Sequence, residues 1–167
     1  MPIQRIYLVG FMGAGKTTVG RELALKLRWP FLDLDAEIEK SEKLSVREIF
    51  AQFGEARFRQ LEREQLQRVS DASQAIVALG GGAYIDPGNR VIVDTTGVAV
   101  WLDTSLASVK ERVRPGGSRP LLADAERAQQ LYVERLPSYR LARIHVLTDN
   151  RLPDAIAEEI VQKVRNL

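Results

Sequence analysis

"LVGFMGAGKTTVGREL", residues 8–23, passes from apolar residues typical of a strand, through a glycine-rich turn, into a helical pattern. Residues 10–17 match the pattern G-x-x-x-x-G-K-[ST] at every specified position. Glycines let the backbone N–H groups of such a loop curl around a phosphate at the positive end of the following helix. Lys16 would then reach the β- and γ-phosphates, and the Thr17 hydroxyl would coordinate Mg²⁺. A chance glycine-rich turn is the alternative, but the strand before and the helix after it favour a nucleotide site.

Short strand-like runs alternate with longer helical stretches along the rest of the chain. The predicted strands are residues 5–10, 31–35, 75–80, 98–103 and 144–148. Apolar residues recur at helical spacing over residues 16–28, 54–72 and 152–167. Such alternation implies a mostly parallel sheet with helices on both faces. We therefore predict a three-layer α/β/α fold around a central five-stranded parallel sheet, in one domain over residues 1–167.

Composition limits the classes of partner. The chain has 167 residues, of which 45% are hydrophobic and 28% charged, as in one globular domain. No apolar run approaches the roughly 20 residues of a membrane span, and we expect no signal peptide before the first strand. The net charge of +2 is too small to indicate a nucleic-acid partner, and the absence of cysteine excludes disulfides and thiolate metal sites. We expect a cytoplasmic protein with small-molecule substrates and neither a nucleic-acid nor a membrane partner.

Two carboxylates lie at the carboxyl end of the second predicted strand, in the sequence LDLD, residues 32–35. Because they are two residues apart on this strand, Asp33 and Asp35 point to one face, at the edge where open α/β sheets bind ligands. Adjacent carboxylates repel unless a cation shares them, and Mg²⁺ would be that cation. We assign Asp33 to the metal shell, through water, and Asp35 to an acceptor hydroxyl whose proton it takes. The alternative is a solvated strand end that caps the next helix.

An acid and an arginine lie three residues apart in the sequence RFRQLE, residues 57–62. Arg59 and Glu62 can form an ordinary surface ion pair, worth only a few tenths of a kcal/mol. Alternatively, Glu62 holds the Arg59 guanidinium rigid so that it can bind a substrate carboxylate.

Two further glycine-rich segments occur. Gly80, Gly81 and Gly82 follow the third predicted strand and expose backbone N–H groups that can bind part of a polar substrate, although glycine-rich loops after strands are common. The run RVRPGGSRPLLAD, residues 112–124, combines glycines with several arginines. We expect it to form a mobile lid that excludes water and places an arginine over the phosphates. A flexible surface loop is the alternative for this run.

These motifs, in this order, resemble those of the shikimate kinase family. The resemblance covers nearly the whole chain through GFMGAGKTTVGREL, FLDLD, IF…GE..FR..E, LGGGA, RPLL, R.P.Y and TDNR. It implies a P-loop kinase fold with a mobile lid. It also implies transfer of the γ-phosphoryl group of ATP to the 3-hydroxyl of shikimate, giving shikimate 3-phosphate and ADP on the pathway to chorismate and aromatic amino acids.

The resemblance also implies roles for individual residues. The implied ATP-binding residues are Gly13, Ala14, Gly15, Lys16, Thr17, Thr18, Arg112, Arg119 and Arg151, with Arg112 and Arg151 beside the adenine. The implied shikimate-binding residues are Asp35, Phe50, Phe58, Arg59, Glu62, Gly81, Gly82 and Arg135. Among these, Arg59 and Arg135 would bind the carboxylate, Glu62 would orient Arg59, and Phe50 and Phe58 would form apolar walls. The implied catalytic residues are Lys16, Asp35 and Arg119, and Thr17 and Asp33 would bind one Mg²⁺ ion. A monomer is expected, with a substrate-binding region over about residues 33–62.

Three other functions fit parts of the sequence. Another small-metabolite kinase, such as a gluconate kinase, would share the phosphate loop without the set of Asp33, Asp35, Arg59 and Arg135. A nucleoside monophosphate kinase would need a base-recognition pocket and a longer lid. A catalytically silent nucleotide-binding regulator would lack one of the three implied catalytic residues, and the sequence has them all.

Overall fold

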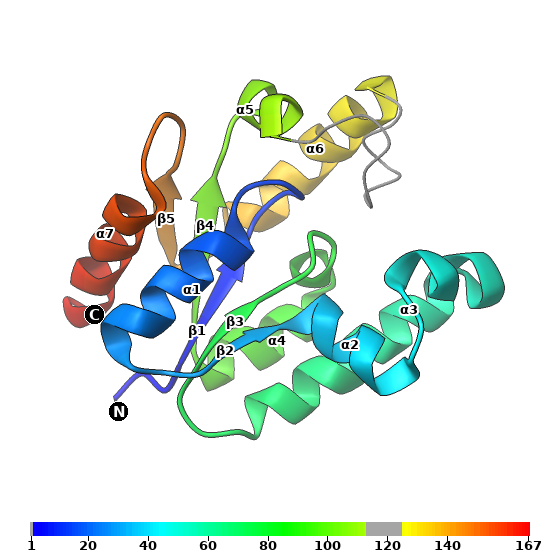
Figure 1. The fold of residues 1–167 in the computed structure, drawn as a ribbon, viewed down its shortest axis with the longest axis horizontal. Helices are drawn as coiled ribbons and strands as arrows, with labels where there is room; N and C mark the ends of the chain where they lie inside the picture. Colours follow the sequence, from blue (N-terminus) through cyan, green and yellow to red (C-terminus); the bar gives the residue numbers. More distant parts are fainter. Residues whose placement is uncertain (1, 113–124) are drawn as a thin grey trace.

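A computed structural model describes residues 2–112 and 125–167 of the chain, with the backbone alone at Arg112 (Figure 1). The strands are β1 (Arg5–Val9), β2 (Phe31–Asp33), β3 (Ala75–Ala78), β4 (Val98–Asp103) and β5 (Ile144–Leu147). The α-helices are α1 (Lys16–Leu27), α2 (Leu34–Glu42), α3 (Val46–Ser70), α4 (Pro87–Thr96), α5 (Leu106–Arg112), α6 (Ala125–Tyr139) and α7 (Pro153–Arg165). A short 3₁₀ helix, η1 (Ala83–Ile85), follows β3.

The strands form one parallel sheet in the order β2-β3-β1-β4-β5. On the central strand β1, Ile6 pairs with Ile76 of β3 on one side and with Val98 of β4 on the other. This confirms the five-stranded parallel sheet predicted from the sequence. Because the strands are parallel, the loops that leave β1, β2 and β3 emerge at the same edge of the sheet, and the proposed site residues follow these strands.

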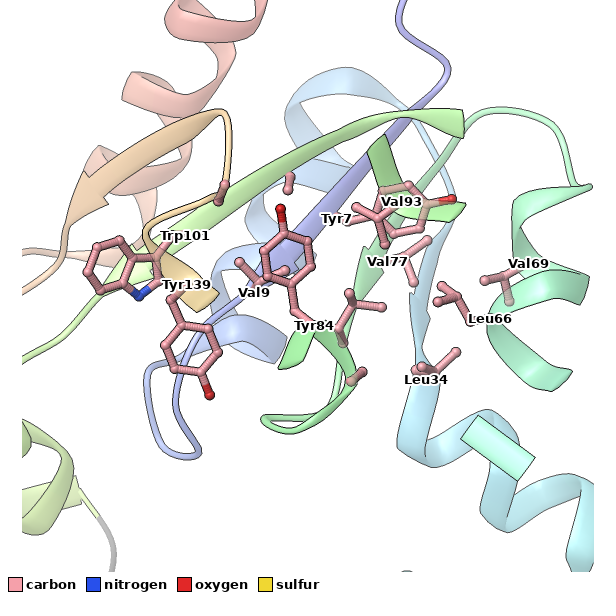
Figure 2. Packing of buried hydrophobic residues seen from close by; sticks show 14 of the residues in the cluster. Tyr7, Val9, Leu34, Leu66, Val69, Val77, Tyr84, Val93, Trp101 and Tyr139 are labelled. Atoms are coloured by element: carbon pink, nitrogen blue, oxygen red, sulfur yellow. The ribbon is translucent and has the colours of Figure 1, made fainter. Parts of the chain in front are cut away.

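The sheet is covered on both faces, which explains why every residue of β1 is buried. Ile6 and Leu8 pack against residues of α1 and α7, which lie side by side in Figure 1. Tyr7 and Val9 point to the other face, where they join residues of α3, α4 and α6. Figure 2 shows this second cluster, with Trp101 and Tyr139 at one end and Leu66 and Val69 at the other.

Several predicted boundaries differ from those of the structure. The prediction of a strand over residues 31–35 is wrong beyond Asp33, because Asp33 caps α2 and accepts a hydrogen bond from the backbone N–H of Ala36. The helix predicted from residue 54 is α3, which begins earlier, at Val46. This helix contains a kink at Gly54 (φ 81°, ψ 172°). Ser45 and Glu48 start this helix with a reciprocal capping box.

The predicted lid, residues 112–124, lies outside the described residues except for the backbone of Arg112 at the end of α5. Within the described ranges, no helix combines the length and apolar character that a membrane span requires.

Candidate active site

The loop between β1 and α1 has the geometry of a phosphate cradle. Gly15 caps α1 with φ 94°, a conformation that glycine adopts without strain, and contributes no capping side chain. Gly10 approaches β4 so closely that a Cβ would lie 2.9 Å from the carbonyl oxygen of Leu102. Lys16 Nζ lies over the loop and donates to the carbonyl oxygens of Gly10 (2.6 Å) and Phe11 (3.1 Å). The loop backbone, the helix N-terminus and one ammonium group therefore converge where a phosphate chain would bind.

Asp33 and Thr17 meet beside this loop. Thr17 Oγ1 donates to Asp33 Oδ2 at 2.9 Å, and the other carboxylate oxygen of Asp33 caps α2. The capping interpretation of Asp33 is therefore confirmed, whereas its role in a metal shell stays a prediction. A hydroxyl and a carboxylate are hard oxygen ligands of the kind Mg²⁺ accepts, with water and phosphate oxygens completing its shell. Among the described residues, no three His, Cys, Asp or Glu side chains form a cluster that could hold a metal ion.

Each glycine of the segment Gly80–Gly82 approaches a different charged group. A Cβ on Gly80 would lie 2.8 Å from Asp35 Oδ1 and 3.2 Å from a carboxylate oxygen of Glu62. A Cβ on Gly81 would lie 2.9 Å from Arg135 Nη1. A Cβ on Gly82 would lie 2.5 Å from both terminal nitrogens of Arg59. The segment therefore carries a carboxylate at one end and two guanidinium groups towards the other.

Asp35 reaches this segment from the first turn of α2, because the chain turns from strand to helix at Asp33. The prediction that Asp33 and Asp35 share one strand face is therefore wrong. The strand-to-helix turn instead divides them between two tasks, with Asp33 at Thr17 and Asp35 at Gly80.

Glu62 is buried, and Arg59 above it is partly exposed. The Glu62 side chain is 1% exposed, and its carboxylate accepts from Arg59 Nη1 at 3.0 and 3.2 Å. On the outer side, Arg59 also contacts the exposed Glu55 at 3.4 Å. Burial raises the pKa of Glu62 to about 7, an effect that Arg59 opposes and Asp35 reinforces. This pair is therefore not an ordinary surface ion pair.

Arg135 and the two phenylalanines complete the surroundings of the segment. Arg135 on α6 is 7% exposed, and its guanidinium carbon lies 5.9 Å from the ring centroid of Phe11. Phe58 is buried and packs against the exposed ring of Phe50 at 4.8 Å between centroids. The guanidinium of Arg59 lies 5.3 Å from the ring centroid of Phe58. Apolar surface therefore borders the arginine groups.

Known proteins are similar to this chain in both sequence and fold. The family profile "SKI: Shikimate kinase" matches residues 12–165. A shikimate kinase from Sulfurihydrogenibium sp. (strain YO3AOP1) is 42% identical over 164 residues, covering 98% of this chain and 99% of that relative. The structure of shikimate kinase from Acinetobacter baumannii in complex with shikimate has a TM-score of 0.93 at 36% identity, covering 98% of this chain and 94% of that one. This chain belongs to the shikimate kinase family.

A further shikimate kinase structure also resembles this chain in both sequence and fold, whereas a gluconokinase shares only the fold. The enzyme from Aquifex aeolicus gives a TM-score of 0.88 at 34% identity, covering 97% of this chain and 96% of that one. A gluconokinase from Sinorhizobium meliloti gives 0.60 at 19% identity, covering 99% of this chain and 94% of that one. The P-loop kinase fold and the enzyme class predicted from the motifs, a phosphotransferase, are thus confirmed by membership of the shikimate kinase family.

Of the three arginines predicted to bind ATP, the structure describes the side chain of Arg151 alone. Arg119 and the side chain of Arg112 lie outside the described part of the chain. Arg151 follows β5 and pairs with Glu159 of α7 at 2.6 Å while donating to the carbonyl oxygen of Leu147. This pair ties the TDNR turn to α7.

Sequence reasoning missed Tyr139 as a residue of this site, and it missed the role of Gly80 as the neighbour of Asp35. Gly80 makes room for Asp35, and the Tyr139 hydroxyl donates to the carbonyl oxygen of Gly81 at 2.6 Å. Tyr139 lies one helical turn after Arg135 within the motif R.P.Y, and that spacing was the available signal.

Substituting Glu62 with glutamine should remove a pH dependence of stability. The pKa of Glu62 is raised from 4.5 to about 7 in the folded chain, so folding favours the protonated form. Wild-type unfolding free energy should therefore fall from about pH 4.5 to about pH 7, by on the order of 3 kcal/mol from this group. Urea unfolding from pH 5 to 8 should show Glu62→Gln gaining stability relative to wild type as pH rises.

Glu55→Gln is the matched control, since Glu55 contacts the same Arg59 from an exposed position. Its stability relative to wild type should not change with pH over this range. A flat difference between wild type and Glu62→Gln would contradict the raised pKa.

Proposed function

We propose that this chain transfers the γ-phosphoryl group of ATP to the 3-hydroxyl of shikimate, giving shikimate 3-phosphate and ADP. The observation that carries this proposal is the row of charges along Gly80–Gly82, with Asp35 at one end and Arg135 and Arg59 beyond it. Shikimate has a carboxylate at one end and ring hydroxyls at the other, which matches that row. The Acinetobacter baumannii relative, solved in complex with shikimate, supports the same acceptor.

The mechanism follows from positions. Arg59 and Arg135 would hold the acceptor carboxylate, so that a ring hydroxyl faces Asp35, which would accept its proton as the oxygen attacks the γ-phosphorus. Lys16 and the backbone of the phosphate loop would hold the phosphates and stabilise the charge that develops on them. Most of the acceleration would come from this alignment and from fixed charges.

We propose that the enzyme uses one Mg²⁺ ion with ATP. Thr17 and Asp33 are the residues that would hold it, and their 2.9 Å contact supports this assignment. When bound, Mg²⁺ would neutralise part of the charge of the phosphates. We expect the enzyme to act as a monomer.

Measuring ADP release by the purified protein with Mg·ATP tests the function. Shikimate, gluconate, a nucleoside monophosphate and no acceptor should be compared. ADP release above background with shikimate alone is the expected result. Turnover with another acceptor, and none with shikimate, would support the assignment as a kinase and contradict shikimate as its acceptor.

Replacing Arg135 with alanine should weaken acceptor binding. A charged hydrogen bond to the shikimate carboxylate would be lost, so the KM for shikimate should rise by about 10- to 100-fold. The KM for ATP should stay close to the wild-type value, since Arg135 lies at Gly81, on the proposed acceptor side. Steady-state kinetics with each substrate varied in turn separates the two effects.

Arg140→Ala provides the control, because Arg140 is exposed just after α6. That variant should keep both KM values. An unchanged KM for shikimate in Arg135→Ala would remove Arg135 from the acceptor site.

A further inference from the structure

Tyr139 holds the glycine segment through a buried hydrogen bond. Its hydroxyl donates to the carbonyl oxygen of Gly81 at 2.6 Å, and its side chain is 1% exposed. The ring stacks on Trp101 of β4, with 6.2 Å between centroids and 29° between planes, and Figure 2 shows the two rings together. The donor is therefore anchored to the sheet and to α6 at once.

The bonded peptide has unusual freedom, because it lies within three consecutive glycines. Backbone hydrogen bonds run from Ala83 N–H to the Gly80 oxygen (3.1 Å) and from Ile85 N–H to the Gly82 oxygen (3.2 Å). Neither involves the Gly81 carbonyl. Tyr139 supplies the bond that fixes the orientation of this carbonyl.

That orientation matters because an arginine lies at each side of the peptide. Arg135 Nη1 would be 2.9 Å from a Cβ on Gly81, and Arg59 would be 2.5 Å from one on Gly82. A Gly81 carbonyl turned towards these groups would accept their hydrogen bonds. It would then compete with an acceptor carboxylate for the same donors.

The phenol is suited to this task at any ordinary pH. Burial raises the pKa of Tyr139 to about 12, although Arg135 and Arg59 both oppose the shift. The hydroxyl therefore keeps its proton and remains a donor throughout the range in which the enzyme would be assayed.

We infer that Tyr139 is a positioning residue, which holds the Gly81–Gly82 peptide so that Arg59 and Arg135 remain available to the acceptor carboxylate. The inference rests on the proposed function for the identity of the acceptor. The claim that Tyr139 fixes the orientation of this peptide does not depend on which acceptor binds.

Tyr139→Phe keeps the ring and removes the bond, and Tyr7→Phe is its matched control. Tyr7 is also fully buried, and its hydroxyl bonds Thr96 Oγ1 at 2.7 Å; Figure 2 shows Tyr7 apart from Tyr139, with Val9 and Tyr84 between them. Tyr139→Phe should raise the KM for shikimate about 5- to 20-fold and leave kcat and the KM for ATP near wild type. Tyr7→Phe should lose comparable thermal stability with no change in either KM.

Amide hydrogen exchange of the ligand-free protein tests the fixing of the peptide without any substrate. The Ala83 amide should exchange faster in Tyr139→Phe than in wild type or Tyr7→Phe. Unchanged exchange would overturn the inference, as would an unchanged KM in folded Tyr139→Phe when wild type phosphorylates shikimate. Lack of turnover in wild type would refute the proposed function instead, and the exchange result would still decide the fixing role.

If Tyr139→Phe does not fold, wild-type protein provides the test. The Tyr139 hydroxyl proton should give a slowly exchanging NMR signal, before and after shikimate is added. Rapid exchange of that proton with water in the ligand-free protein would overturn the inference.

Discussion

Asparagine at position 35 should lower kcat for shikimate phosphorylation by about 100- to 10,000-fold, the range expected when a general base is lost. The amide has nearly the shape of the carboxylate but cannot take a proton from the attacking hydroxyl. Asp35 lies at Gly80 in the first turn of α2 and is not among the residues proposed to bind ATP, so ATP binding should persist. Steady-state turnover and calorimetric titration with ATP measure the two properties separately.

Glu37→Gln is the control for this substitution. Glu37 occupies the same first turn of α2, so its neutralisation removes a comparable interaction with the helix dipole. That variant should keep wild-type turnover. Near-normal turnover in Asp35→Asn would remove Asp35 from the chemistry and leave it at most a role in binding.

The strand that precedes Asp35 shows what sequence alone can and cannot predict. The alternation LDLD fits a strand, with Leu32 and Leu34 on one face, and it equally fits a strand that ends in a helix cap. Leu34 is buried in either case, so hydrophobicity does not distinguish the two. The turn is decided by the Asp33 carboxylate, which accepts from Ala36 N–H, a local bond that competes with strand pairing.

The glycine segment was foreseen as exposed backbone, but its neighbours were not. Three consecutive glycines indicate that another group approaches the backbone closely, but they do not identify that group. Asp35, Arg59 and Arg135 come from three different helices, and only the parallel sheet brings those helices to the same edge. Likewise, the sequence does not predict the burial of Glu62, because an i,i+3 spacing of Arg59 and Glu62 is equally compatible with an exposed helix face. The packing of the folded chain buries Glu62.

Replacing Lys16 with methionine should lower kcat by about 100- to 1,000-fold, because a positive charge aimed at the transferring phosphoryl group is lost. Methionine retains most of the length and apolar stem of lysine. Charge builds up on the phosphates in the transition state, so turnover should fall further than ATP affinity. In this structure, Lys16 Nζ donates to the carbonyl oxygens of Gly10 and Phe11 in its own loop.

Lys26→Met is the matched control on the same helix. Lys26 lies in the last turn of α1 and pairs with Asp154 at 2.8 Å and Glu158 at 3.4 Å. This variant also loses a lysine with its contacts, but at the end of the helix away from the phosphate loop. Its turnover should match wild type, since its ion pairs only join α1 to α7. Equal kcat in Lys16→Met and Lys26→Met would show that the loop binds phosphate without a catalytic contribution from Lys16, which would leave the backbone N–H groups and the helix dipole as its source of charge stabilisation.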